Sequence, residues 1–240
     1  MRKLSEKDIC EICGSSLKYA TVQEDYKKLN CYFCAKEFLT NTFCPDGHYI
    51  CDQCHSSKPV KIIREFCKKT ELKNPFLIAE KIMQHPEFKL YGPEHHALTP
   101  AVILTALKNN DIKKPNGKDI TFSDIDEAIR RGSEIPGGYC GFYGSCGAGM
   151  GSGIAISIFT NATPAKDVPR SLANEMTSRA LNKIADDLEH CCKRSVRLSI
   201  LECLRFLKEK FSIDLDYKPR SCPFTEMNKE KCSFELCPIY

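Results

Sequence analysis

Apolar residues recur every three or four positions through most of the chain beyond residue 58, and this spacing predicts helices rather than strands. In the first of these segments, Val60, Ile62, Ile63, Phe66 and Cys67 share one side, where Cys67 is expected to act as a small buried apolar residue. The predicted helices span residues 60–70, 74–85, 101–108, 121–131, 154–159, 169–188 and 195–211. The sequence therefore predicts a mainly α protein.

Local signals place the ends of several of these helices. Pro59 is expected to close the segment that precedes the first helix. Thr99 is a good N-cap and Pro100 a good first helical residue, so a helix is predicted to begin there. Ser123 or Asp124 is expected to start the helix that follows.

The first 57 residues differ from the rest, because they have few aliphatic side chains and carry cysteines in pairs. Two cysteines separated by two residues can place both sulfurs about 2.3 Å from one zinc ion. Pairing in chain order or cross-braced, interleaved pairing are both compatible with the spacing. The pattern predicts a zinc-ribbon, treble-clef-like or cross-brace module over residues 1–57 and a helical domain over 58–240. The predicted ligands, enough for two zinc ions, are Cys10, Cys13, Cys31, Cys34, Cys44, His48, Cys51 and Cys54.

The zinc of this module is expected to be structural. A segment this short with so small an apolar content needs the free energy of metal binding to fold. Ligation by protein side chains alone also leaves no open position for a substrate. The lysines and aromatic residues of the module leave open a second role, which is docking to RNA or to a partner enzyme.

Residues 131–153 hold nine of the 13 glycines, together with Cys140 and Cys146. Glycine is used where the backbone bends sharply or approaches another group closely. The helix predicted after this stretch presents unpaired N–H groups and partial positive charge, which favour a thiolate or a sulfide-bearing cofactor. We expect Gly138, Gly141 and Gly147 to lie against such a group. The alternative is that glycines let two helices pack closely, and it involves Gly147, Gly149, Gly151 and Gly153.

Glu94, His95 and His96 precede the helix predicted to begin at Pro100, so they are expected in a loop. Carboxylates and imidazoles serve as metal ligands or as acid–base groups. Neighbouring side chains on extended backbone point in opposite directions, so one of the two histidines is expected to face a site.

A second set of cysteines lies near the end of the chain. Cys191 and Cys192 come just before a predicted helix, where the positive helix end, Lys193 and Arg194 would favour thiolates. The tail cysteines end in Cys-Pro, as iron–sulfur ligands do. We predict that these thiols converge with those of the glycine-rich stretch on one site, which holds an iron–sulfur cluster such as 4Fe-4S or uses reactive thiols. Its members would be Cys140, Cys146, Cys191, Cys192, Cys222, Cys232 and Cys237.

Composition narrows the class of protein. Sixteen cysteines in 240 residues, with no apolar run at the start and no segment near the roughly 18 apolar residues that span a bilayer, favour metal-binding or catalytic thiols over disulfides. We therefore expect a reducing, cytoplasmic location, and no secretory leader or membrane segment. The formal net charge of +4 falls if thiolates bind metal, so charge alone gives no strong attraction to nucleic acid.

Four features together resemble the domain of unknown function 5714, over about residues 60–240. They are Pro136-Gly-Gly-Tyr-Cys-Gly-Phe-Tyr-Gly-Ser-Cys-Gly-Ala, Tyr91-Gly-Pro-Glu-His-His, Cys191-Cys-Lys-Arg and the closing Cys237-Pro. The resemblance implies an origin in archaea or anaerobic bacteria, where the family sometimes neighbours radical-SAM or methyltransferase domains. Such a context favours iron–sulfur or sulfur-transfer chemistry.

Three hypotheses follow. In the first, the chain is a metalloprotein enzyme for redox or sulfur-transfer chemistry, in which Cys140 and Cys146 act as ligands or nucleophiles. His95 or Glu94 would then move protons, and the basic residues beside Cys191 and Cys192 would bind a small anionic or sulfur-containing substrate. In the second, all metals are structural and the protein is an adaptor for RNA or a partner enzyme. In the third, Cys140 and Cys146, or the two adjacent cysteines, cycle between thiols and a disulfide without a cluster.

Overall fold

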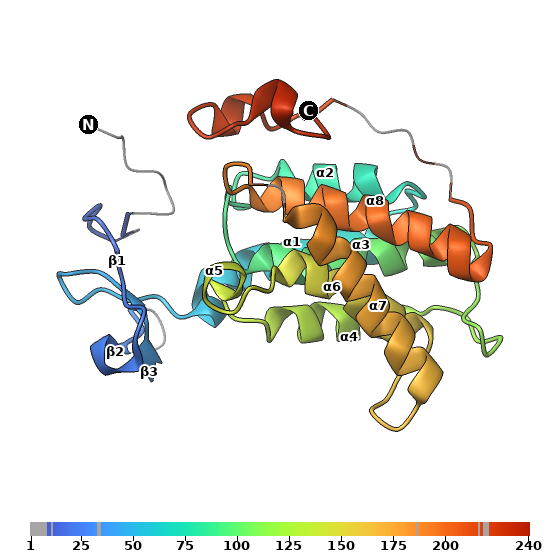
Figure 1. Ribbon diagram of the computed structural model, residues 1–240, viewed down its shortest axis with the longest axis horizontal. Helices are drawn as coiled ribbons and strands as arrows, with labels where there is room; N and C mark the ends of the chain where they lie inside the picture. Colours follow the sequence, from blue (N-terminus) through green and yellow to red (C-terminus); the bar gives the residue numbers. More distant parts are fainter. Residues whose placement is uncertain (1–8, 11, 33–34, 186, 216, 218–220) are drawn as a thin grey trace. The chain divides into compact units, whose positions relative to one another are not determined.

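The computed structural model describes residues 9–10, 12–32, 35–185, 187–215, 217 and 221–240. The chain divides into two compact units, Met1–Ser57 and Lys58–Tyr240. Helices dominate the described residues, and a module rich in cysteine precedes them (Figure 1). The predicted fold class, mainly α with a cysteine-rich N-terminal module, is therefore confirmed.

The N-terminal unit contains two short antiparallel strand pairs. β1 (Lys18–Tyr19) pairs with β4 (Thr42–Phe43), β2 (Lys27–Asn30) pairs with β3 (Glu37–Thr40), and the 3-10 turn η2 (Gln23–Asp25) precedes β2. Most of the strand residues are exposed. The buried apolar residues among those described in this unit are Ala20 and the cysteines Cys10, Cys31, Cys44 and Cys51. An interior made of thiols has almost no hydrocarbon to bury, so its stability must come largely from elsewhere.

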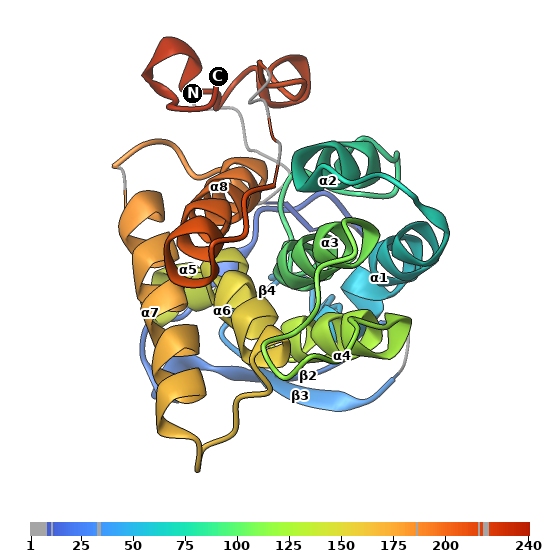
Figure 2. The same cartoon turned by 90° about the vertical axis from the view of Figure 1, so that its right-hand side faces the viewer.

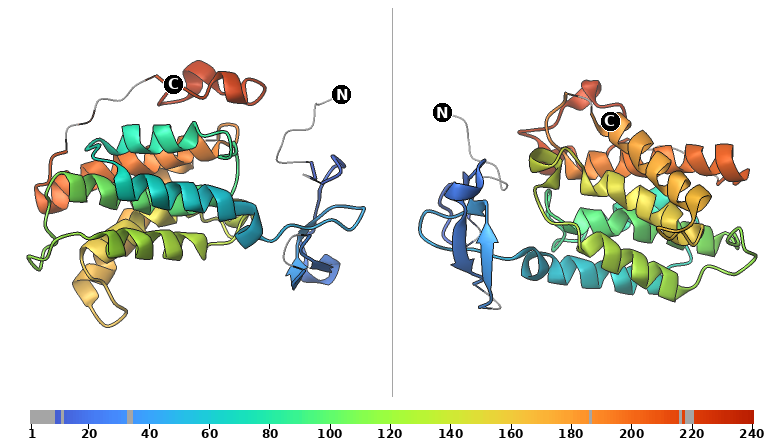
Figure 3. Two further views of the ribbon diagram at one scale, coloured as in Figure 1. Left: turned by 180° about the vertical axis from the view of Figure 1, so that it is seen from behind. Right: turned by 60° about the horizontal axis from the view of Figure 1, so that its bottom comes forward.

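The second unit is a bundle of helices followed by a short tail. The tail residues 221–240 lie on the side of α2 and α8 (Figures 1 and 3). Among the helices of the described residues, none is both long enough and apolar enough to cross a bilayer. The elements are α1 (Asp52–Lys69, which begins in the first unit), α2 (Pro75–Met83), α3 (Glu94–Asn109), α4 (Phe122–Ser133), α5 (Tyr139–Phe142), α6 (Gly147–Phe159), α7 (Asp167–Ile184), α8 (Cys192–Phe211), η3 (Glu226–Asn228) and η4 (Phe234–Leu236).

Helix α3 forms the centre of the bundle. It contacts α2, α4, α6 and α8, and Figure 2 shows it surrounded by them. Every residue from Ala97 to Leu107 is buried. A helix that is apolar on all sides is stable only when other helices enclose it, so its sequence requires this central place.

Glycines let α6 approach its neighbours closely. A Cβ atom on Gly151 would lie 2.8 Å from the Pro100 side chain and 3.0 Å from the His96 carbonyl oxygen on α3. On the opposite side, a Cβ atom on Gly153 would lie 1.9 Å from Thr177 Oγ1 and 2.8 Å from the Ala173 carbonyl oxygen on α7. The glycine-rich stretch is therefore used, at these positions, for close helix packing.

Two helices begin earlier than the local signals indicate. α6 starts at Gly147 rather than near residue 154, with its glycines inside the helix. α3 starts at Glu94, so Glu94, His95 and His96 are helical and not in a loop, and Pro100 lies inside the helix. Tertiary packing stabilises both starts, because it outweighs the low helix propensity of glycine and one hydrogen bond lost at proline.

Smaller corrections concern α1 and α4. α1 runs through Pro59, where a break was expected. The N-cap of α4 is Thr121, which forms a capping box with Asp124, rather than Ser123 or Asp124 itself. Asp124 thus lies inside the first turn, where its carboxylate accepts a hydrogen bond from the Thr121 backbone N–H at 2.8 Å.

Candidate functional site

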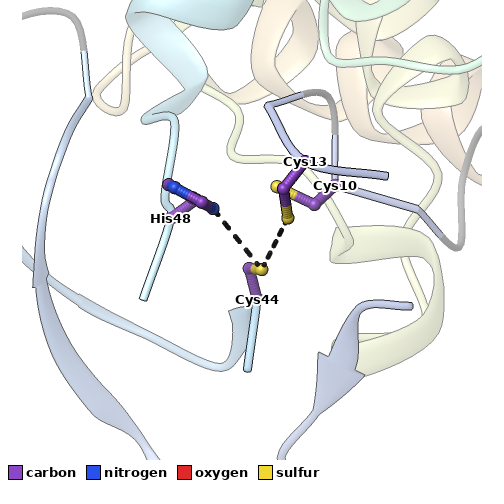
Figure 4. A group of neighbouring side chains, drawn as sticks. All are labelled: Cys10, Cys13, Cys44 and His48. Carbon is purple, nitrogen blue, oxygen red and sulfur yellow. Dashed lines mark hydrogen bonds between the residues drawn. The ribbon is translucent and has the colours of Figure 1, made fainter. Parts of the chain in front are cut away.

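Four side chains of the N-terminal unit converge. Cys10, Cys13, Cys44 and His48 each place one ligand atom within 4.8 Å of the others (Figure 4). Cys13 Sγ lies 3.5 Å from Cys44 Sγ, which lies 3.8 Å from His48 Nδ1. Tetrahedral zinc, with bonds of about 2.0–2.3 Å, needs ligand atoms about 3.5–3.8 Å apart. This Cys3His group can therefore hold a metal ion with little rearrangement.

Two tight turns present these ligands. The Cys10 carbonyl accepts a hydrogen bond from the Gly14 N–H at 2.8 Å, and the Cys44 carbonyl accepts one from the Gly47 N–H at 3.0 Å. Gly14 and Gly47 have φ angles of 74° and 82°, a region that glycine occupies without strain. Each turn thus brings two ligands to the same side of the backbone.

Electrostatics at this group also suit a cation. Hydrogen bonds from Ser15 lower the pKa of the Cys13 thiol to about 7. Burial raises the pKa of the Cys44 thiol to about 11, although the Asp46 N–H points to its sulfur at 3.4 Å. A bound metal ion would supply the positive charge that Cys44 needs to ionise, because thiolates rather than thiols are the ligands.

The grouping is that of the interleaved alternative and not that of pairing in chain order. The first cysteine pair joins Cys44 and His48, while Cys31 lies next to Cys51, whose N–H donates to Cys31 Sγ at 3.4 Å. Both cysteines are buried. Cys34 and the side chain of Cys54, the other two predicted ligands, lie outside what the structure describes.

In the helical unit, one imidazole brings together two thiols that are far apart in sequence. His190 Nε2 lies 3.8 Å from Cys140 Sγ and 3.9 Å from Cys192 Sγ. The His190 ring stacks on Tyr91, with ring centroids 5.4 Å apart. Tyr91 is held in turn by a 3.0 Å hydrogen bond from its hydroxyl to Asn228 Oδ1. Cys140 is exposed and Cys192 is half-buried, so the Cys140 thiol is the more accessible of the two.

Cys146 lies at the N-terminus of α6, as its N-cap, and is half-buried against the core. The space beside Gly147 is filled by the His96 ring, which a Cβ atom there would approach to 2.3 Å. His96 Nδ1 lies 3.0 Å from the Ile135 carbonyl oxygen. Gly138, with φ of 79°, is the N-cap of α5, and Gly141 borders open space. His96 thus takes the place beside Gly147 where a cofactor was expected.

Glu94 and His95 are fully buried at the start of α3. His95 Nδ1 lies 3.1 Å from the Gly92 carbonyl oxygen and 3.4 Å from Glu94 Oε1. A Cβ atom on Gly92 would lie 2.1 Å from Glu94 Oε2, so only glycine fits against this carboxylate. Burial raises the pKa of the Cys192 thiol, and the charges of Cys146, Glu94 and Cys191 raise it further. A hydrogen bond with the Gly92 backbone acts in the opposite direction and lowers this pKa.

The adjacent cysteines Cys191 and Cys192 lie at two different places. Cys192 lies beside His190, whereas Cys191, the N-cap of α8, lines a pocket between α8 and the tail. Three tail cysteines and four basic residues share this pocket: Cys222, Cys232, Cys237, Lys193, Arg194, Arg197 and Lys231. Burial raises the pKa of Cys191 and lowers that of Lys193 to about 8. The predicted single site is therefore two neighbouring groups of thiols.

The residues that sequence reasoning missed are His190 and Tyr91. His190 directly precedes Cys191, which is a signal that was available. Its stacking on Tyr91 joins positions almost a hundred residues apart, and nothing in the local pattern indicates such a contact.

Comparison with known proteins gives one match. The model of the family of unknown function DUF5714 matches residues 63–240. No curated protein and no solved structure matches the chain.

Proposed function

We propose that this chain, which belongs to the family of unknown function DUF5714, is a metalloprotein whose helical unit carries out thiol-based redox chemistry. One observation carries the proposal, the placement of Cys140 and Cys192 on either side of His190 Nε2, at 3.8 and 3.9 Å. A nucleophilic thiol next to an oriented base is the usual arrangement for attack on sulfur or carbon. The substrate class is a small molecule that contains a disulfide bond.

The chemistry is a thiol–disulfide exchange in two steps. Cys140 Sγ loses its proton to His190 Nε2 and attacks one sulfur of the substrate, which breaks the sulfur–sulfur bond and releases the other half as a thiolate. Cys192 then loses its proton and attacks Cys140 Sγ, which releases the second half of the substrate as a thiolate. The two thiolates take up the two protons. One substrate disulfide is reduced to two thiols, and the two protein thiols are oxidised to one disulfide.

The surroundings of Cys140 support its role as the attacking thiol. No residue of α5 is buried, so the thiol is accessible. Gly138 and Gly144, on either side of α5, have φ angles of 79° and 61°. Glycine adopts other backbone angles at little cost, so these two positions are where the segment would bend when the two sulfurs form a bond of about 2.05 Å.

The second part of the proposal is a structural zinc ion in the N-terminal unit. Three thiols and one imidazole fill all four positions of a tetrahedral zinc site, so no position remains for a substrate. The described residues of this unit form almost no hydrocarbon core, and metal binding would supply its folding free energy.

The test uses the full chain, purified without oxygen and treated with oxidised glutathione, followed by alkylation and peptide mass spectrometry. Wild-type protein is expected to form a Cys140–Cys192 disulfide. In a Cys192→Ser variant the mixed disulfide of Cys140 with glutathione should accumulate. A His190→Gln variant should form that adduct about tenfold more slowly or worse, since a positioned base contributes at least that much.

A Cys146→Ser variant is the matched control, because serine is also a good N-cap for α6 and Cys146 is the other thiol of the same stretch. It should behave as the wild type. If Cys146→Ser rather than Cys192→Ser traps the adduct, the assigned pair is wrong. If glutathione modifies the exposed thiols without preference and Cys140 forms no disulfide with another cysteine, the helical unit has no exchange centre. The hypothesis of an adaptor without redox chemistry would then replace this proposal.

A further inference from the structure

We propose that Cys191, Cys222, Cys232 and Cys237 bind a [4Fe–4S] cluster between the N-terminus of α8 and the tail. All four side chains line one pocket, and all four are half-buried. This site does not depend on the exchange centre, because none of its four thiols takes part in the steps assigned to Cys140 and Cys192. Cysteine-only ligation by four thiolates is the usual way in which proteins hold such a cluster.

The tail contacts α8, whose N-cap is Cys191, and the segment that precedes α3. Arg197 Nη1 donates to the Ile239 carbonyl oxygen at 2.7 Å. Lys193 Nζ lies 4.8 Å from the centroid of the Phe224 ring, and Phe224 is buried. The Tyr91 hydroxyl donates to Asn228 at 3.0 Å, and Asn228 lies between Cys222 and Cys232 in the tail. The tail cysteines are thus held against α8 by contacts that do not involve the thiols themselves.

No three of these four thiols lie close enough together to share a single metal ion. Sulfur atoms bound to one tetrahedral metal lie about 3.8 Å apart, because each bond is about 2.3 Å long. Cys10, Cys13, Cys44 and His48 meet a limit of 4.8 Å, and no other trio within the described part of the chain does so. In a [4Fe–4S] cluster each cysteine binds a different iron, so the sulfurs must be further apart than around one ion.

The charges around the pocket favour an anion. Lys193, Arg194, Arg197 and Lys231 line it, and no acidic residue does so in the described part of the chain. Lys193 and Arg197 are almost completely buried and already have partners in the protein: Arg197 Nε lies 3.4 Å from Glu80 Oε1, and Lys193 Nζ donates to the Met83 and Lys89 carbonyl oxygens at 3.1 Å. One carboxylate among four basic residues leaves the lining of the pocket net positive. Four thiolates and their cluster carry net negative charge, and the positive end of α8 adds to the stabilisation. The basic residues therefore match the ligand that the thiols would hold.

Backbone groups already point at two of the sulfurs. Cys191 Sγ accepts a hydrogen bond from the Arg194 N–H, and Cys232 Sγ accepts one from the Phe234 N–H, both at 3.4 Å. Such N–H groups stabilise thiolates and set the potential of iron–sulfur clusters. Proline follows Cys222 and Cys237, and Cys237 is extended, with φ of −77° and ψ of 123°.

The experiment is metal and sulfide analysis of the full chain, produced and purified without oxygen. Wild-type protein should contain about four iron and about four sulfide ions per chain, in addition to the metal of the N-terminal unit. It should show broad visible absorption. It should also give an electron paramagnetic resonance signal after reduction with dithionite. Cys222→Ser and Cys232→Ser should each lose most of the iron and sulfide while the far-ultraviolet circular dichroism keeps its helical signal.

A Cys140→Ser variant is the control and should keep its iron, since Cys140 is an exposed thiol outside the pocket. A Cys222→Ser protein that lacks iron but still forms the glutathione adduct on Cys140 separates this proposal from the exchange centre. Colourless wild-type protein, or one zinc or iron without sulfide at the pocket, would overturn the cluster. Iron that is lost with Cys140→Ser and kept with Cys222→Ser would assign it to other ligands.

Discussion

Replacing Gly132 with alanine should destabilise the helical unit, although alanine is the better helix former. Gly132 lies near the end of α4, and a Cβ atom there would meet Ala97 Cα and the His96 carbonyl oxygen, each at 2.6 Å. Ordinary contact begins at 3.4 Å, so α4 and α3 would have to separate by about 0.8 Å. The atoms that are met belong to backbone in the centre of the bundle, and no side-chain rotation can relieve the contact.

The magnitude follows from two opposing effects. Overpacking of this kind costs about 1–3 kcal/mol. The higher helix propensity of alanine returns up to about 1 kcal/mol. We therefore expect Gly132→Ala to lower the free energy of unfolding by about 1–2 kcal/mol, with a matching fall in the denaturant midpoint.

Gly141→Ala is the matched control. Gly141 is also helical, but no atom lies within 4 Å of the position that its Cβ would take. This variant should change the unfolding free energy by less than about 1 kcal/mol, and in the stabilising direction. The assay is urea denaturation followed by far-ultraviolet circular dichroism, in which the helices of residues 58–240 give most of the signal. A Gly132→Ala protein as stable as Gly141→Ala would refute the close contact between α3 and α4.

Three further predictions rest on other contacts. Asn74 Oδ1 accepts hydrogen bonds from two N–H groups at the start of α2, so Asn74→Ala should cost about 1 kcal/mol in urea denaturation, while Asn182→Ala, at an exposed position of α7, should cost much less. Burial alone would raise the pKa of Asp124, but hydrogen bonds from the almost buried Lys114 and from Thr121 at the α4 cap lower this pKa below its ordinary value of 3.8. The ionised carboxylate therefore stabilises the fold at pH values above 3.8. Asp124→Asn should therefore cost about 2 kcal/mol at pH 7, and the difference from wild type should shrink as acid takes the pH below 3.8; a difference independent of pH would contradict the ion pair. Cys44→Ser should remove one metal equivalent and make the N-terminal unit sensitive to protease, while the helical circular dichroism signal stays unchanged. If the wild-type unit resists protease equally well with and without a chelator, it is not stabilised by a metal ion.

The amino-acid sequence by itself determined most of the helices. The apolar spacing predicted segments that correspond to α1, α2, α4, α7 and α8, since the helix period depends on residues only three or four positions apart. It also determined the kinds of ligand available and the short turns that pair Cys10 with Cys13 and Cys44 with His48. Gly14, which follows Cys13, fits a tight turn because glycine adopts positive φ angles without strain, which is a local property of the residue.

Only the tertiary structure decided which groups share a site. Cys10 and Cys13 meet Cys44 rather than the nearer pair at Cys31, and Cys140 meets an imidazole 50 positions away. The tertiary structure also decided where α6 begins. Glycine in a helix is about 1 kcal/mol per residue less favourable than alanine, so the local sequence predicted a loop there. Close contacts with α3 and α7 outweigh that local preference, because burial acts between elements that the chain brings together only when it folds.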